Sequence, residues 1–268
     1  MERRRFLITG FKAATMLCGA AALSTNPALA QGRRRRRAKI LAVEAGDPDA
    51  SAEYVNIQKA PIDQIYRAPV TRGIRKDPER MALATLDMAK TYLGISRSSR
   101  PDQVEKFLNL FGLHIRYPNG EVVPYCASGL AYAACHAYST IAPPEQFDTN
   151  DPVPGFKRVL SDINHYYFKP SPACRLMVRD AIRRGVWSWG DQTATSAIKP
   201  GWLVFYNWKK RRRGVAQHVG IVDHAGEAVV NTVEFNTSDT SGGSQSNGGA
   251  VARKQRPYQF VLGYIKTH

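Results

Sequence analysis

The sequence of 268 residues contains only four cysteines, and none of them forms a Cys-x-x-Cys pair. That number excludes a disulfide-dense scaffold, and the lack of paired cysteines gives no support for a zinc ribbon. Long apolar runs are also missing, because no stretch supplies the roughly 20 apolar residues of a membrane-spanning helix. Acidic residues are outnumbered, with 22 Asp and Glu against 38 Lys and Arg, for a net charge of +16. This excess favours an anionic partner without identifying it.

Hydrophobic residues make up 43% of the chain and aromatic residues 10%, which excludes wholesale disorder. The length is enough for one large domain or two modest ones, with a core that needs no disulfides. Composition therefore indicates a globular, basic protein, and the motifs along the chain must supply its function.

Residues 1–30 have the pattern of a twin-arginine signal peptide. Residues 3–7 (RRRFL) supply the arginine pair, an apolar run follows over 11–23, and residues 28–30 (ALA) are small enough for cleavage. Cleavage would remove four basic residues and one acidic residue, and would lower the net charge from +16 to +13. We therefore expect an exported protein, located in the periplasm or outside the cell.

Residues 31–76 are predicted to be a basic tail and linker. They contain five consecutive arginines, Arg33 to Arg37, and no sustained hydrophobic period. Such a run is typical of a solvated tail, and it also suits peripheral contact with anionic polymer or lipid headgroups. Nucleic acid would suit the charge equally, but an exported protein is not expected to meet it.

Residues 77–268 are predicted to form one α+β domain. Asp77-Pro78 resembles a helix N-cap followed by proline at the first helical position, and Gly94 would end that helix. Pro124 cannot lie inside a helix, so the alanine-rich stretch that follows is expected to begin its helix near Cys126. The remaining predicted elements are helices near 101–111, 159–167 and 175–184, then strands at 202–208, 218–223, 228–235 and 260–266. Helices followed by antiparallel strands define an α+β fold.

Cys126 is the first candidate for chemistry. At a helix start, free backbone N–H groups and the helix dipole favour thiolate over thiol, as a cysteine nucleophile requires. Taken alone the position is weak, because a cysteine beside an alanine-rich helix is commonly just a small buried residue.

His218 and Glu234 strengthen that interpretation, because each lies on one of two neighbouring predicted strands. If residues 224–226 form a three-residue hairpin loop, His218 lies opposite Thr232 and shares a sheet face with Glu234. A two-residue loop would instead put the two side chains on opposite faces. Asn236 follows Glu234 closely and is expected at the same site.

These residues also carry a family resemblance. Residues 124–127 (PYCA), 217–222 (QHVGIV) and 234–237 (EFNT) resemble the cysteine, histidine and third motifs of the CHAP family of cysteine- and histidine-dependent amidohydrolases and peptidases. Residues 187–190 (WSWG) and the closing segments 249–251 and 263–265 are similar to phage-endolysin-type members. The resemblance covers about residues 80–268, and the motifs occur in the family's order.

The resemblance implies a papain-like fold and a peptidoglycan hydrolase, with no metal and no cofactor. Cys126 would attack an amide carbonyl and form a thioester, and His218 would shuttle protons. Glu234 would orient His218, and Asn236 would support the same site. Peptidoglycan is then the expected partner, and the protein is expected to be a monomer.

Three features depart from the family pattern. Trp202 stands where an aspartate is usual, and Phe235 replaces a glycine between Glu234 and Asn236. The stretch 141–172 is longer than the usual connection and is predicted to be an insertion that covers or reshapes the cleft. These departures leave a second hypothesis, in which a CHAP-like fold binds cell-wall polymer without cutting it.

Some alternatives stay open at this level. A rival pairing of Cys126 with His136 is disfavoured, since nearly three helical turns would separate them. Cys135 and Cys174 are predicted either to form a disulfide or to be two buried thiols. Each of the four tryptophans is expected to pack in the protein core rather than to stack on a sugar ring. The bond cut stays open between the muramoyl–alanine amide, a stem-peptide bond and a crosslink.

Overall fold

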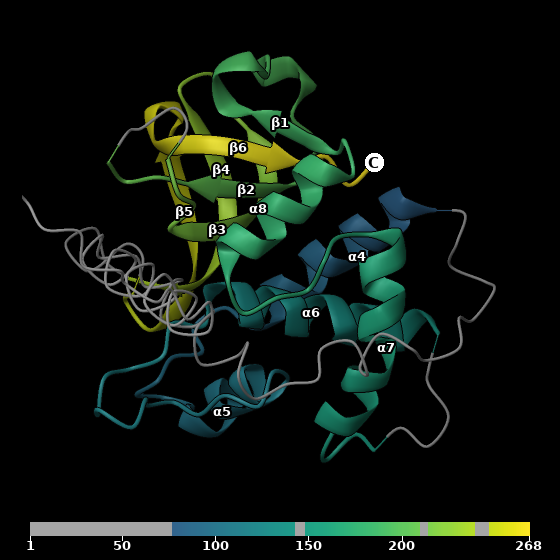
Figure 1. Ribbon diagram of the computed structural model, residues 1–268, viewed down its shortest axis with the longest axis vertical. Helices are drawn as coiled ribbons and strands as arrows, with labels where there is room; N and C mark the ends of the chain where they lie inside the picture. Colours follow the sequence, from purple (N-terminus) through teal and green to yellow (C-terminus); the bar gives the residue numbers. More distant parts are fainter. Residues whose placement is uncertain (1–76, 143–147, 210–213, 239–246) are drawn as a thin grey trace, which may run out of the picture. The chain divides into compact units, whose positions relative to one another are not determined.

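The structure is a computed structural model that describes residues 77–142, 148–209, 214–238 and 247–268 (Figure 1). The predicted signal peptide and the basic tail and linker of 31–76 lie outside the described residues. Within them the chain has five α-helices and a six-stranded antiparallel sheet, so the predicted α+β class is confirmed.

The helices come first, as expected: α4 (Pro78–Thr91), α5 (Pro101–Asn109), α6 (Cys126–Ile141), α7 (Val153–Tyr166) and α8 (Cys174–Arg183). The strands are β1 (Trp187–Trp189), β2 (Leu203–Tyr206), β3 (His218–Ala225), β4 (Val229–Thr237), β5 (Ala250–Pro257) and β6 (Val261–Ile265). Their order in the sheet is β1-β6-β2-β3-β4-β5, and all neighbouring strands run antiparallel.

The predicted helix start at Asp77-Pro78 is confirmed in α4. The Asp77 carboxylate accepts a hydrogen bond of 2.8 Å from the Arg80 amide, and Pro78 occupies the first turn. Beyond the C-terminal end, Gly94 has a φ of +82°, a value that glycine adopts without strain.

The sheet separates two clusters of buried side chains. The larger cluster joins α4 to α8 with residues of the sheet such as Phe205, Ile221 and Phe235, and α4 to α7 lie on one side of the sheet in Figure 1. The smaller cluster contains Trp202 and Tyr206. The Trp202 ring lies 6.1 Å from that of Tyr264, so this tryptophan packs in the core, as predicted.

Two strands, β1 and β5, were not predicted. In β5 the buried residues occur only near the ends, because Arg253, Lys254 and Gln255 occupy its middle. A charged edge strand is one way in which sheets avoid pairing with another chain, and it removes the hydrophobic period used to find strands. Strand β1 has only three residues, all half-buried, and gives an equally short signal.

The predicted hairpin register is wrong, but its functional consequence is preserved. Thr232 pairs with Val222 instead of His218, the loop falls after Ala225, and a bulge lies between Val222 and His224. The pairing is therefore displaced by four residues along β3. An even displacement keeps each residue on its predicted face, so His218 and Glu234 still share one.

Replacing Gly129 by Ala is expected to lower the free energy of unfolding by about 1–3 kcal/mol. Gly129 lies inside α6, where helix propensity alone would favour alanine by about 1 kcal/mol. An added methyl would, however, overlap the ring of Phe235 on β4. Urea denaturation measures the change, and a Phe235→Leu background should reduce it. A more stable Gly129→Ala protein would contradict this close packing of α6 on β4.

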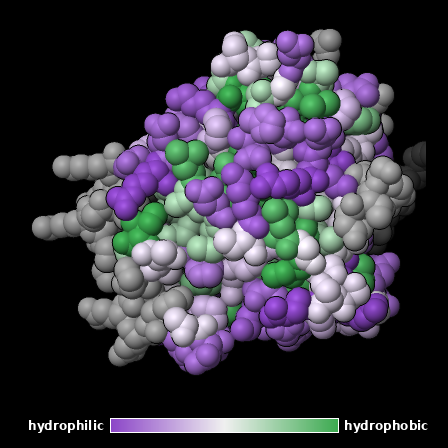
Figure 2. Space-filling model, turned by 180° about the vertical axis from the view of Figure 1, so that it is seen from behind, coloured by the Kyte–Doolittle hydropathy of each residue, from purple (hydrophilic) through white to green (hydrophobic). Residues whose placement is uncertain are grey.

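On the face seen in Figure 2, hydrophobic residues form small separate patches among hydrophilic ones. Among the described helices, none is long and apolar enough to cross a bilayer.

Candidate active site

Cys126 is the first residue of α6, and its side chain is buried. The preceding Tyr125 is held by a hydrogen bond of 2.7 Å from its hydroxyl to the Gly249 carbonyl. The first N–H groups of a helix have no partner within the helix. The backbone of Cys126 therefore places a donor and the positive end of a helix dipole beside its own sulfur.

His218 is the first residue of β3, and its imidazole contacts Glu234 of β4. Nε2 of His218 lies 3.0 Å from Oε2 of Glu234, and both side chains are fully buried. The imidazole stacks on the Tyr206 ring, with 6.0 Å between centroids and 27° between planes. Packing and the carboxylate together fix the orientation of the imidazole.

Arg256, on β5, also binds Glu234, and the sequence did not single it out. Its Nε donates to Oε1 of Glu234 at 2.9 Å, and its Nη2 donates both to Oε2 and to the Thr237 hydroxyl. Thr232 adds a hydroxyl donor to Oε1 at 2.9 Å. The guanidinium lies 5.0 Å above the Trp208 ring. Glu234 is thus an anion with several donors, in a site from which water is excluded.

The charges of this cluster are strongly coupled. Burial raises the pKa of Glu234, but the Arg256 hydrogen bond and the His218 charge outweigh it and lower that pKa to about 2. Burial lowers the pKa of His218, but hydrogen bonding and charge from Cys126 and Glu234 outweigh it and raise that pKa to about 9. At neutral pH His218 is therefore an imidazolium beside an ionised carboxylate.

The His218 imidazolium also affects the pKa of the Cys126 thiol. The neighbouring Cys174 thiol lowers the pKa of Cys126, burial raises it, and His218 lowers it further, so that it lies well below the ordinary value. The hydrogen bond between His218 and Cys126 that shifts both pKa values departs from standard geometry, since Nδ1 of His218 has no partner at ordinary distance and angle among the described residues. With Nε2 held by Glu234, Nδ1 is the nitrogen left for proton transfer with Cys126.

Asn236 is anchored between two other residues of the site. Its Oδ1 accepts a hydrogen bond of 2.6 Å from Arg97, and its Nδ2 donates to Asn247 at 3.2 Å. Arg97 also donates to the Val123 carbonyl at 2.9 Å, just before α6. Asn236 has a φ of 57°, which asparagine tolerates better than most residues. These contacts tie the end of β4 to the segment that positions Cys126.

Cys135 and Cys174 are two buried thiols, which is one of the two alternatives that the sequence left open. The described cysteines are all buried and none is joined by a disulfide, so the Cys135–Cys174 bridge is absent. Cys174, the first residue of α8, instead lies with its Sγ 3.7 Å from the Sγ of Cys126. The rival His136 has Nδ1 2.6 Å from the Tyr92 hydroxyl, and so its ring is engaged elsewhere.

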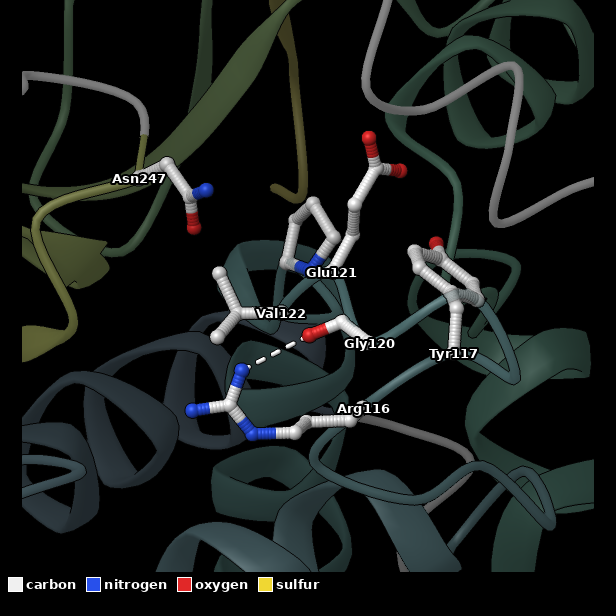
Figure 3. A pocket seen from close by; sticks show the side chains of 7 residues that line it. Arg116, Tyr117, Gly120, Glu121, Val122 and Asn247 are labelled. Carbon is white, nitrogen blue, oxygen red and sulfur yellow. Dashed lines mark hydrogen bonds between the residues drawn. The ribbon is translucent and has the colours of Figure 1, made fainter.

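A pocket of about 450 Å³ lies beside the segment that leads to Cys126 (Figure 3). Its lining residues are Arg116, Tyr117, Gly120, Glu121, Val122, Pro124 and Asn247. Arg116 donates a hydrogen bond of 2.7 Å to the Gly120 carbonyl, and Figure 3 shows the Glu121 carboxylate on another side of the pocket. A cation, an anion and an aromatic ring thus surround one opening.

Comparison with known proteins gives no match: no family model, no curated protein and no solved structure matches the chain. The described residues contain no cluster of three or more His, Cys, Asp or Glu side chains suited to a metal ion. The interpretation of the site accordingly depends on its own geometry and charges.

Proposed function

We propose that the protein is an exported cysteine amidohydrolase or endopeptidase that hydrolyses amide bonds in peptidoglycan. The observation that carries the proposal is the buried His218–Glu234 pair, electrostatically coupled to a thiol at the start of α6. A nucleophile, a base and a group that orients the base are the parts that covalent amide hydrolysis needs. The fold proposed for this arrangement is papain-like.

The first half of the reaction forms a thioester. The Cys126 thiolate attacks the carbonyl carbon of the scissile amide, and the backbone N–H of Cys126 stabilises the resulting oxyanion. His218 then gives the proton on Nδ1 to the departing amine nitrogen as the C–N bond breaks. Glu234 stays ionised throughout and stabilises the imidazolium.

The second half releases the acid. His218, now neutral, takes a proton from water as the water oxygen attacks the thioester carbonyl. The carbon–sulfur bond breaks, and the Cys126 thiolate and His218 imidazolium are restored. Cys126 is only 1% exposed, so a substrate must displace part of the cover over the sulfur before the attack.

Peptidoglycan is proposed as the substrate because three features of the sequence favour it. The export signal would take the protein to the cell wall, the net charge of +13 left after cleavage suits an anionic polymer, and the motifs resemble those of CHAP hydrolases. The Arg33 to Arg37 run would add contact with the same polymer or with lipid headgroups. The proposed oligomeric state is a monomer, located in the periplasm or outside the cell.

One observation favours a second candidate function. The thiol and the imidazole are both buried, as they would be in a protein that keeps the fold and binds cell-wall polymer without cutting it. The charged cluster opposes this alternative, because a binder gains nothing from a buried histidine, carboxylate and arginine in contact. Burying such charges costs free energy, and removing them would often stabilise a protein that did not use them.

Digestion of purified sacculi separates the two functions. The hydrolase releases soluble fragments, and mass spectrometry of their new ends identifies the bond as a muramoyl–alanine amide, a stem-peptide bond or a crosslink. A binder sediments with the sacculi and releases nothing. Sedimentation without release, in a protein whose thiols are fully reduced, would refute the hydrolase.

The pH dependence of kcat/KM should be bell-shaped, with its alkaline limb near pH 9. Above that pH His218 loses the proton that it must give to the leaving amine, because its pKa is raised to about 9. The acid limb reports protonation of the Cys126 thiolate and should lie well below the ordinary thiol value. Glu234→Gln removes the carboxylate that helps to keep His218 charged, and should move the alkaline limb to lower pH. A limb that stays in place would contradict the assigned pair.

Replacing Arg116 by Ala is expected to raise KM roughly tenfold, the effect of one lost hydrogen bond to a charged group, with kcat little changed. The reason is that Arg116 lines the pocket beside Pro124 without belonging to the charged cluster. Arg100→Ala is the matched control, since Arg100 pairs with exposed Asp102 away from this pocket. Equal KM values in the two variants would exclude the pocket as a substrate subsite.

A further inference from the structure

Two helices bring their first residues together at the proposed nucleophile. Cys126 begins α6 and Cys174 begins α8, 48 positions apart in sequence, and their sulfur atoms are 3.7 Å apart. A disulfide requires about 2.05 Å between sulfur atoms, so side-chain rotation over less than about 2 Å would close the gap. The thiols are thus already placed as a pair.

The hydrolytic reaction gives the second thiol no covalent role, although its contact with Cys126 helps to lower the pKa of the nucleophile. Cys126, His218 and Glu234 supply the nucleophile, the proton carrier and the orienting group. Cys174 follows α7 and lies two residues beyond the 141–172 stretch that is predicted to be an insertion. A group of another kind could donate the same hydrogen bond, so a second thiol in contact with the reacting sulfur requires a further explanation.

We infer that Cys174 is a resolving thiol, which forms a reversible disulfide with Cys126 when the site meets a hydroperoxide. The site is thereby a modification site as well as a candidate hydrolase centre. Cys135 does not share this arrangement, because it lies in the middle of α6 and not at a helix start.

The oxidation proceeds in two balanced steps. The Cys126 thiolate attacks the terminal, hydrogen-bearing oxygen of the hydroperoxide and the O–O bond breaks. The alkoxide, or hydroxide from hydrogen peroxide, takes the proton of the His218 imidazolium and leaves as an alcohol or water, and Cys126 becomes a sulfenic acid. The Cys174 sulfur then attacks the Cys126 sulfur, the S–O bond breaks, and the oxygen departs as water with the Cys174 proton. Two electrons pass from the two thiols to the peroxide, and any dithiol reductant can return them.

Two consequences follow for the site. In the disulfide the Cys126 sulfur is no longer a thiolate and cannot attack an amide. The same bond protects Cys126 from the irreversible oxidation to sulfinic acid that an unresolved sulfenic acid undergoes. The loss of hydrolysis rests on the proposed function, whereas the disulfide itself does not.

The test is peptide mapping after exposure of the reduced, full-length chain to hydrogen peroxide under native conditions. The expected product is a crosslink between the peptides that contain Cys126 and Cys174, with the loss of two hydrogen atoms in mass. Dithiothreitol should then restore alkylation of both residues. Because the measurement needs no substrate, its result does not depend on whether the protein is a hydrolase.

Two variants sharpen the test. Cys174→Ser should give no crosslink and should accumulate sulfinic acid at Cys126, which dithiothreitol does not reverse. Cys135→Ala should behave as wild type. A crosslink that joins Cys126 to Cys18 or Cys135, or equal sulfinic acid formation in wild type and Cys174→Ser, would overturn the inference.

Discussion

Cys126→Ser is expected to lower the release of fragments from sacculi by about 10⁴-fold or more, the effect seen when a covalent nucleophile is removed. The substitution keeps the size of the side chain, so the start of α6 should persist. It removes the reaction because a serine hydroxyl is not ionised by the neighbouring imidazolium as a thiol is. Fragment release is measured by chromatography of the soluble products.

Cys135→Ala is the matched control for that experiment. Cys135 is buried in the same helix, and burial raises its pKa, so it takes no part in the proposed chemistry. It should keep most of the wild-type activity. Equal activity in wild type and Cys126→Ser would mean that another group is the nucleophile.

Arg256→Met is expected to lower the free energy of unfolding by about 3–5 kcal/mol, the usual cost of breaking a buried ion pair from one side. Glu234 is fully buried and would lose both of its Arg256 hydrogen bonds, leaving His218 as its only cation. Methionine preserves much of the volume of the arginine stem, so the loss reports charge more than packing. Urea denaturation at neutral pH measures it.

A double-mutant cycle shows whether the charge is the cause. Adding Glu234→Gln to Arg256→Met removes the unpaired anion, and the pair should therefore destabilise less than the sum of the single changes. Additive losses would indicate that Arg256 acts only through packing against Trp208. A loss in Arg256→Met below about 1 kcal/mol would contradict the buried pair altogether.

The parts of the fold that local sequence determines could be predicted. The Asp77-Pro78 cap, the start of α6 near Cys126 and the class of the domain all follow from residues close together in the chain. The sequence also correctly predicted that His218 and Glu234 share a sheet face, although the predicted hairpin register was wrong. Successive side chains of a strand alternate between the two faces of the sheet, so a register displaced by an even number of residues leaves each side chain on the same face.

The rest of the site depends on contacts between distant segments. Arg256 lies on β5, a strand that is hard to predict because charged residues in its middle interrupt the hydrophobic pattern. Cys174 contacts Cys126 only because α8 begins beside the start of α6. Arg97 likewise meets Asn236 from far away in the chain. Residue spacing within one segment cannot predict such contacts, because they depend on how the helices pack on the sheet.

If His218 activates Cys126 as a nucleophile, the rate at which Cys126 is alkylated must depend on pH and on His218. Reduced protein is treated with iodoacetamide, and each cysteine is followed by peptide mass spectrometry in wild type and in His218→Gln. We expect Cys126 to react far faster than Cys135 in wild type. The pH midpoint of Cys126 alkylation should lie well below the ordinary thiol pKa in wild type, and it should rise in His218→Gln. If Cys126 reacts as slowly as Cys135 in both proteins, the nucleophile and the proposed hydrolase are contradicted together.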